Sequence, residues 1–120
     1  MDKFPLTQNI SRLWASIVVD ELAKNGIIDF YTAPGMRNAP ILAAAHHHEE
    51  IQTYSFLDER ALSYRALGRA KASDKIPLLN CTSGTAMANF LPAVIEANKS
   101  GLPLVILTAD RPSELVRTDS

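Results

Sequence analysis

Apolar and polar positions follow two different periods along the chain. Short apolar runs predict strands, and these runs are residues 27–33, 51–57, 77–81 and 102–109. Helices are predicted where apolar residues recur every three or four positions or where Ala is frequent, at residues 7–24, 38–47, 59–72 and from the turn at 82–85 to about residue 99. Alternating helices and buried strands predict an α/β fold, a three-layer α/β/α arrangement with a parallel sheet.

Residues at the helix ends refine these predictions. Thr7 is placed to cap the first helix, and Gly26 to end it in the left-handed conformation. Pro92 predicts a kink or an irregular turn in the last helix, whereas the polar tail 113–120 predicts no regular element. The first helix carries an apolar stripe that we expect to face a core, formed by Ile10, Leu13, Trp14, Ile17, Val18 and Leu22.

Polar clusters follow each predicted strand, at residues 34–38, 58–60, 82–85 and 110–112. Right-handed crossovers put all these loops on one edge of a parallel sheet, where open α/β folds bind ligands. Arg37 and Arg111 lie in two of the clusters, and a guanidinium suits carboxylate recognition. Each arginine alone is weak evidence because most are surface residues. Two on one edge favour an acidic ligand.

Asp58 and Glu59 stand where a strand gives way to a helix. A carboxylate is common at a helix start, so capping is the ordinary interpretation. Asp58 alone suffices for the cap, which leaves Glu59 free for another role. The turn that begins Thr82-Ser83 offers hydroxyl and N–H groups suited to an anion or a polar ring edge, although a simple capping turn explains it equally well.

Composition narrows the class of protein. The 120 residues carry 12 Lys and Arg against 13 Asp and Glu, which gives no electrostatic reason to expect nucleic acid or an anionic membrane as partner. Cys81 is the single cysteine, and we expect it to be a buried apolar residue in a reducing compartment. With no targeting or membrane-spanning run visible, a cytoplasmic protein is expected. The consecutive His46–His48 cannot converge on one ion, so no metal site is predicted.

Four stretches, in order and at compatible spacing, carry a resemblance to a known family. They are Ala-Pro-Gly-Met-Arg-Asn-Ala-Pro at 33–40, Asp-Glu-Arg at 58–60, Thr-Ser-Gly-Thr-Ala at 82–86 and Leu-Thr-Ala-Asp-Arg-Pro-Ser-Glu-Leu at 107–115. The chain resembles the start of the MenD family, the thiamine-diphosphate-dependent 2-succinyl-5-enolpyruvyl-6-hydroxy-3-cyclohexene-1-carboxylate (SEPHCHC) synthases. Such a resemblance implies a transferase of menaquinone biosynthesis, which decarboxylates 2-oxoglutarate and adds the four-carbon unit to isochorismate.

The same resemblance implies a divided cofactor site. Residues 1–120 correspond to one partial pyrimidine-binding domain, truncated at its C-terminal end. In the family a separate domain holds the diphosphate and Mg²⁺ through a Gly-Asp-Gly…Asn motif, which is absent from this sequence. Another subunit completes the site, so a homo-oligomer is expected. The 120 residues alone should bind no cofactor measurably and should not turn over.

Individual positions follow from the matched stretches. Glu59 matches the catalytic glutamate that contacts the aminopyrimidine ring of the cofactor and favours its imino tautomer. Burial would raise the pKa of such a glutamate and suit it to proton exchange. Pro34, Gly35, Thr82 and Ser83 are expected beside the cofactor.

Substrate carboxylates are assigned by the resemblance to Arg37 and Arg111. Met36 departs from the family pattern Pro-Gly-Ser-Arg-Ser, which puts the exact acceptor substrate in question. Two alternatives stay open: another thiamine-diphosphate decarboxylase or carboligase, and a non-catalytic flavodoxin-like binding domain in which Asp58 and Glu59 only cap a helix.

Overall fold

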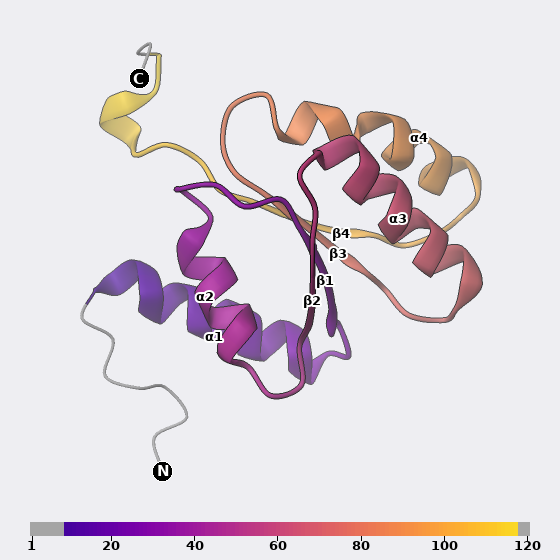
Figure 1. Ribbon diagram of the computed structural model, residues 1–120, viewed down its shortest axis with the longest axis horizontal. Coiled ribbons are helices and arrows are strands. Elements are labelled where there is room, and N and C mark those ends of the chain that lie inside the picture. The colour runs from indigo at the N-terminus through magenta and orange to yellow at the C-terminus, as the bar shows by residue number, and fades with distance from the viewer. Residues whose placement is uncertain (1–8, 118–120) are drawn as a thin grey trace.

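Four strands form one parallel sheet in the computed structural model, which describes residues 9–117 (Figure 1). The strands are β1 (Asp29–Thr32), β2 (Gln52–Ser55), β3 (Leu78–Cys81) and β4 (Val105–Thr108). Their order across the sheet is β2-β1-β3-β4, and every neighbouring pair is parallel. All four strands were predicted, although each is shorter than the apolar run that predicted it.

Helices cover both faces of this sheet and complete the predicted three-layer α/β/α architecture. They are α1 (Ile10–Lys24), α2 (Ala39–His47), α3 (Glu59–Ala72) and α4 (Leu91–Lys99). Figure 1 shows α1 and α2 together on one face, with α3 and α4 on the other. None of the helices within residues 9–117 is long and apolar enough to cross a membrane.

Alternation along the two central strands divides the core between these layers. Successive side chains of a strand point to opposite faces. Phe30 and Leu78 therefore pack in the cluster that includes residues of α1 and α2, whereas Tyr31 and Leu79 pack against α3. All four side chains are buried, which explains why β1 and β3 read as nearly continuous apolar runs rather than as alternating ones.

The ends of the helices test the predictions made from capping residues, Gly26 and Pro92. Gly26 has a φ of 80°, so the left-handed end of α1 is confirmed. Asn9 caps α1 by accepting a hydrogen bond from the Arg12 N–H at 2.9 Å, and the predicted cap Thr7 lies outside the described residues. A 3-10 helix at Met87–Phe90 precedes α4, and Pro92 stands in the first turn of that helix. The predicted irregular turn is thereby confirmed.

The tail prediction was wrong, because Ser113–Leu115 forms a 3-10 helix of three residues. Its backbone is held by a hydrogen bond from the Leu115 N–H to the Pro112 carbonyl at 2.9 Å. A single turn of this kind is too short to produce a periodic pattern in the sequence.

The apolar stripe predicted for α1 faces the core only at its C-terminal end, where Leu22 packs against the core, and the prediction was wrong for Ile10, Leu13, Trp14 and Ile17, which are exposed. Trp14 is 61% exposed and Ile10 is 69% exposed. The buried face instead carries Ala15, Val19 and Ala23, which recur every four residues. The larger apolar residues Ile10, Leu13, Trp14 and Ile17 lie outside this buried face.

Candidate functional site

The loops after the four strands leave the same edge of the sheet, as predicted. Strand register places Thr32 beside Ser55 on one side and beside Asn80 on the other, while Cys81 lies beside Thr108. The chain runs outward from the sheet centre in both directions, because β2 and β3 flank β1. Open α/β sheets bind ligands outside the carboxyl ends of the strands where this reversal occurs, here between β1 and β3.

The loop after β1 (residues 34–38, the β1 loop) touches the turn after β3 (residues 82–85, the β3 turn). A Cβ atom placed on Gly35 would lie 2.4 Å from the Cβ of Thr82 and 2.6 Å from its Oγ1. Only glycine therefore fits this contact without a shift. Two of the residues predicted beside the cofactor, Gly35 and Thr82, are thus brought together at the centre of the edge.

Two buried amides lie beneath the β1 loop, and sequence reasoning missed both. The Asn38 Nδ2 donates to Asn80 Oδ1 at 2.8 Å and to the Ala33 carbonyl at 3.0 Å. Asn80 also accepts a hydrogen bond from the Thr32 hydroxyl at 3.0 Å. One signal was present in the sequence: an asparagine inside the apolar run 77–81 needs buried partners.

Asp58 caps α3, and Glu59 is not needed for this purpose. The Asp58 Oδ1 accepts a hydrogen bond from the Ala61 N–H at 2.8 Å, which confirms the predicted cap. Glu59 is the first residue of α3 and is partly buried. No hydrogen bond or ion pair joins its carboxylate to another residue within 9–117. The carboxyl group therefore stays available to a ligand.

The Cys81 thiol, at the end of β3, is influenced by the charge of Glu59. Burial, and then the nearby charge of Glu59, raise the pKa of the Cys81 thiol to about 11. Cys81 is the last residue of β3, a central strand, and its side chain is fully buried. The charge of Glu59 is therefore felt at the carboxyl end of β3.

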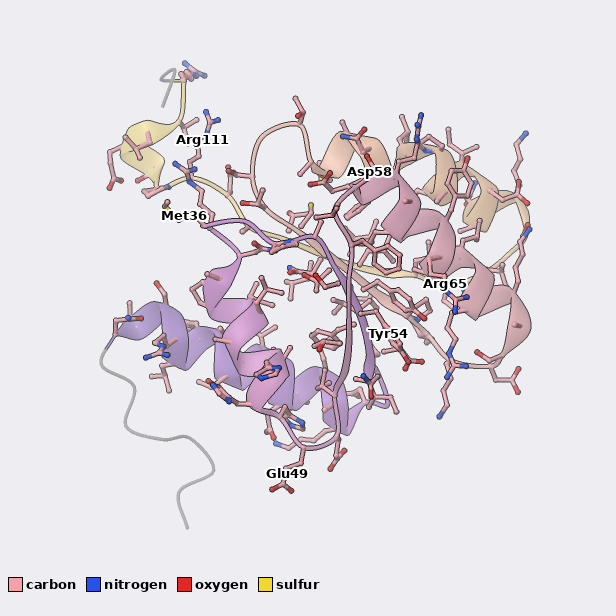
Figure 2. All side chains as sticks on the ribbon, in the orientation of Figure 1. Met36, Glu49, Tyr54, Asp58, Arg65 and Arg111 are labelled. Atoms are coloured by element: carbon pink, nitrogen blue, oxygen red, sulfur yellow. The ribbon has the colours of Figure 1, made fainter. Side chains whose placement is uncertain are left out.

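Both predicted arginines lie at this edge of the sheet. Arg37 belongs to the β1 loop and Arg111 to the segment after β4, and both are partly buried. Figure 2 shows Met36, Asp58 and Arg111 at the edge where the strands end. Met36 is 90% exposed and offers no hydroxyl group at the surface of the loop. No described contact joins either arginine to Glu59.

The β3 turn differs from the prediction in one respect. Thr82 and Ser83 are partly exposed, and Gly84 has a φ of 80°. The turn was expected to start a regular helix, yet α4 begins only at Leu91, after the 3-10 helix. The Thr85 carbonyl accepts hydrogen bonds from the Ala88 N–H and the Asn89 Nδ2, both at 3.1 Å. The turn therefore leads into a 3-10 helix and not directly into an α-helix.

The three histidines lie elsewhere. His46 and His47 are exposed in the last turn of α2, away from the edge where the strands end. His48 is partly buried, and its Nε2 lies 3.6 Å from the Asp20 Oδ1 of α1. In the part of the chain that the structure describes, no three His, Cys, Asp or Glu side chains are grouped so that they could hold a metal ion.

Comparison with known proteins gives a consistent result. Residues 14–120 match the model of the thiamine pyrophosphate enzyme, N-terminal TPP binding domain. A curated protein of Syntrophus aciditrophicus is 53% identical over 116 residues, which cover 97% of this chain and 20% of that protein. One of Psychromonas ingrahamii is 52% identical over 90% of this chain and 19% of its own length.

A third relative, from Haloarcula marismortui, is 49% identical over 90% of this chain and 18% of its own length. All three carry the name 2-succinyl-5-enolpyruvyl-6-hydroxy-3-cyclohexene-1-carboxylate synthase. The chain spans about a fifth of the length of these relatives.

Proposed function

Because the chain belongs to the thiamine pyrophosphate enzyme family, as its N-terminal TPP-binding domain, we propose that it is the pyrimidine-binding part of a SEPHCHC synthase. The complete enzyme would decarboxylate 2-oxoglutarate and add the four-carbon unit to isochorismate, as a cytoplasmic step of menaquinone biosynthesis. Similarity to relatives that carry this name over at least 90% of the chain supports the proposal.

One observation supports the catalytic role most directly: the carboxyl group of Glu59 is not needed to cap α3. Asp58 accepts the Ala61 N–H, so Glu59 can share a hydrogen bond with a ring nitrogen of the aminopyrimidine. When bound, thiamine diphosphate supplies an electron sink for decarboxylation. The residues present therefore fit the pyrimidine half of this cofactor.

The residues around Glu59 suggest separate roles at the edge where the strands end. Glu59 would hold or release one proton at its carboxyl oxygen, beside the buried end of β3. Pro34 and Gly35 would form one wall against the ring, and Thr82 and Ser83 the other, consistent with the contact between Gly35 and Thr82. These assignments apply to the complete cofactor site.

Arg37 and Arg111 would bind carboxylates, which 2-oxoglutarate and isochorismate both carry. Support comes from the place of Arg37 in the loop after β1 and of Arg111 in the segment after β4, both at the edge where the strands end. The diphosphate and Mg²⁺ would be held by a C-terminal domain of another subunit in a homo-oligomer. The 120 residues alone would then supply half a site.

Exchange of Glu59 for Gln in the full-length protein tests the catalytic role. By full-length protein we mean these residues together with the C-terminal remainder that the relatives possess. Glu59→Gln keeps the size of the side chain but removes the titrating oxygen, so the turnover of 2-oxoglutarate with isochorismate should fall by about two orders of magnitude or more. Circular dichroism and the melting temperature should stay unchanged.

The neighbouring residue provides the matched control. Asp58→Asn removes a carboxylate from the same turn but keeps an oxygen that can accept the Ala61 N–H, so the rate should change little. Equal loss of rate in both variants would show that a charge at the helix start matters and that Glu59 has no special role.

Two further measurements address the substrate and the divided site. Consumption of 2-oxoglutarate that depends on isochorismate supports a SEPHCHC synthase, whereas turnover of a different 2-oxoacid would indicate another thiamine-diphosphate decarboxylase or carboligase. Calorimetry with thiamine diphosphate and Mg²⁺ should detect no binding to the isolated chain. Tight binding there would contradict a site shared with a second domain.

A further inference from the structure

Asn38 occupies the N-cap position of α2, but its side chain makes no capping hydrogen bond. Asparagine is among the preferred N-cap residues because its side-chain oxygen can accept a backbone N–H of the first turn. Here the side chain is fully buried and points to the β1 loop and the sheet instead. A departure from the local rule of this kind indicates that the residue serves another purpose.

Both polar atoms of the Asn38 side chain have hydrogen-bond partners around the β1 loop and in β3. Its Oδ1 accepts the Gly35 N–H at 2.8 Å. Its two Nδ2 hydrogens go to the Ala33 carbonyl at 3.0 Å and to the Asn80 Oδ1 at 2.8 Å. Asn38 therefore closes the β1 loop on itself and ties the closed loop to the centre of the sheet.

Asn80, in β3, holds the Asn38 side chain in place through a hydrogen bond. Its Oδ1 accepts both the Asn38 Nδ2 and the Thr32 hydroxyl, which fills the two lone pairs of that oxygen. Its Nδ2 donates to the Leu107 carbonyl of β4 at 2.8 Å. Asn80 is 1% exposed, so it touches no solvent and presents no group to a ligand. Three strands thus determine the position of one amide.

We propose that Asn80 is a positioning residue that acts through Asn38 on the β1 loop and thereby sets the place of the Arg37 guanidinium. Arg37 immediately precedes Asn38, so a shift of the Asn38 backbone moves the arginine directly. Gly35, at the other side of the loop, packs on Thr82 and leaves the loop little room to adjust. The role of Arg37 in binding a carboxylate rests on the proposed function.

Asn80→Leu in the full-length protein is the first test, because the Leu side chain branches at the same atom as that of Asn but neither donates nor accepts a hydrogen bond. The Asn38 Nδ2 then loses its buried acceptor, and the loop must shift to satisfy it. We expect the KM for at least one of the two carboxylate substrates to rise about tenfold, which corresponds to one lost hydrogen bond of ordinary strength. kcat should stay within about threefold, since no group that touches the reacting atoms is changed.

Two controls separate positioning from general loss of stability. Val19→Ala removes apolar volume from the core cluster on the same face of the sheet and should lower the melting temperature without a change in either KM. Thr32→Val removes one hydrogen bond to Asn80 but leaves the link between Asn80 and Asn38, so its KM values should stay within about twofold.

Asn38→Ser gives an independent route if Asn80→Leu fails to fold. A hydroxyl has one hydrogen and cannot replace both Nδ2 bonds, so the same KM should rise. If the two asparagines act as one unit, the double variant should be no worse than the more impaired single variant. Strictly additive effects on KM would overturn the proposal.

Hydrogen exchange of the Gly35 amide distinguishes this proposal from the proposed function. The Gly35 N–H donates to Asn38, so its exchange should accelerate about tenfold in Asn80→Leu but not in Val19→Ala. If the unmodified protein does not turn over 2-oxoglutarate and isochorismate, the proposed function is wrong. The exchange rate of the Gly35 amide would still show whether Asn80 positions the loop. Unchanged exchange, or a KM that rises equally in Val19→Ala, would refute the positioning role.

Discussion

The contact between Gly35 and Thr82 makes a quantitative prediction about two glycines. Gly35→Ala places a Cβ atom 2.4 to 2.7 Å from three side-chain atoms of Thr82, far inside van der Waals contact. Thr82 is β-branched and has few alternative rotamers, so the clash must move the loop or the turn. Overpacking of this kind costs about 1–3 kcal/mol of unfolding free energy.

Gly68→Ala is the matched control, because it makes the same chemical change inside α3. A Cβ atom on Gly68 would meet nothing within 4 Å. Alanine is the better helix former, so this variant should gain about 0.5–1 kcal/mol. The two variants should therefore differ by about 1.5–4 kcal/mol, or roughly 6–16 °C in melting temperature for a domain of this size.

Thermal unfolding followed by circular dichroism measures both variants, and a double variant identifies the cause. Thr82→Gly removes all three atoms that the new Cβ would meet. Combined with Gly35→Ala, it should recover at least about 1 kcal/mol relative to the sum of the single changes. If Gly35→Ala melts as high as Gly68→Ala, the two loops do not touch at the centre of the edge, and the reasoning about the site is wrong.

Three further predictions concern single groups. Asp58→Ala should lower the unfolding free energy by about 1 kcal/mol in urea titrations, and Asn at this position should restore most of it, because the lost bond is the cap to the Ala61 N–H. Cys81 should react very slowly with a thiol reagent at pH 8 and faster only as the pH approaches 11, since its thiolate is disfavoured by burial and by Glu59; rapid reaction at pH 8 in the folded chain would contradict its burial. Trp14 should be quenched by acrylamide in the isolated chain almost as efficiently as a free indole, because it is 61% exposed; a protected indole would show that α1 is packed differently.

Much of the fold could be predicted because the strands are short, apolar and separated by clear turns. The order β2-β1-β3-β4 could not, since a periodic pattern tells which residues are buried but not which strand pairs with which. The orientation of α1 was missed for a related reason. The larger apolar residues suggested one face, while the buried face carries Ala15, Val19 and Ala23. The size of the apolar side chains alone did not identify the buried face of this helix.

In the candidate site, too, some residues could be predicted from the sequence and others could not. Glu59, Arg37 and Arg111 could be selected from the sequence because each follows a predicted strand. The cap at Asp58 could also be foreseen and is confirmed, whereas the role of Glu59 stays a prediction. Asn38 and Asn80 could not be connected, because they are 42 residues apart and their hydrogen bond depends on strand pairing.

The buried pair Asn38 and Asn80 also indicates that the fold gives up some stability in order to fix the position of the β1 loop. An apolar residue at Asn80 would continue the run formed by Leu78 and Leu79, and β3 has no need of a polar group for its own sheet contacts. A buried amide stabilises a fold little in net terms but strongly disfavours any arrangement that leaves it unsatisfied. The network therefore favours the position of the β1 loop in which these buried amide groups keep their hydrogen bonds. That selectivity matters only if something must be held at the carboxyl ends of β1 and β3, the same place to which Glu59, Gly35 and Thr82 independently point.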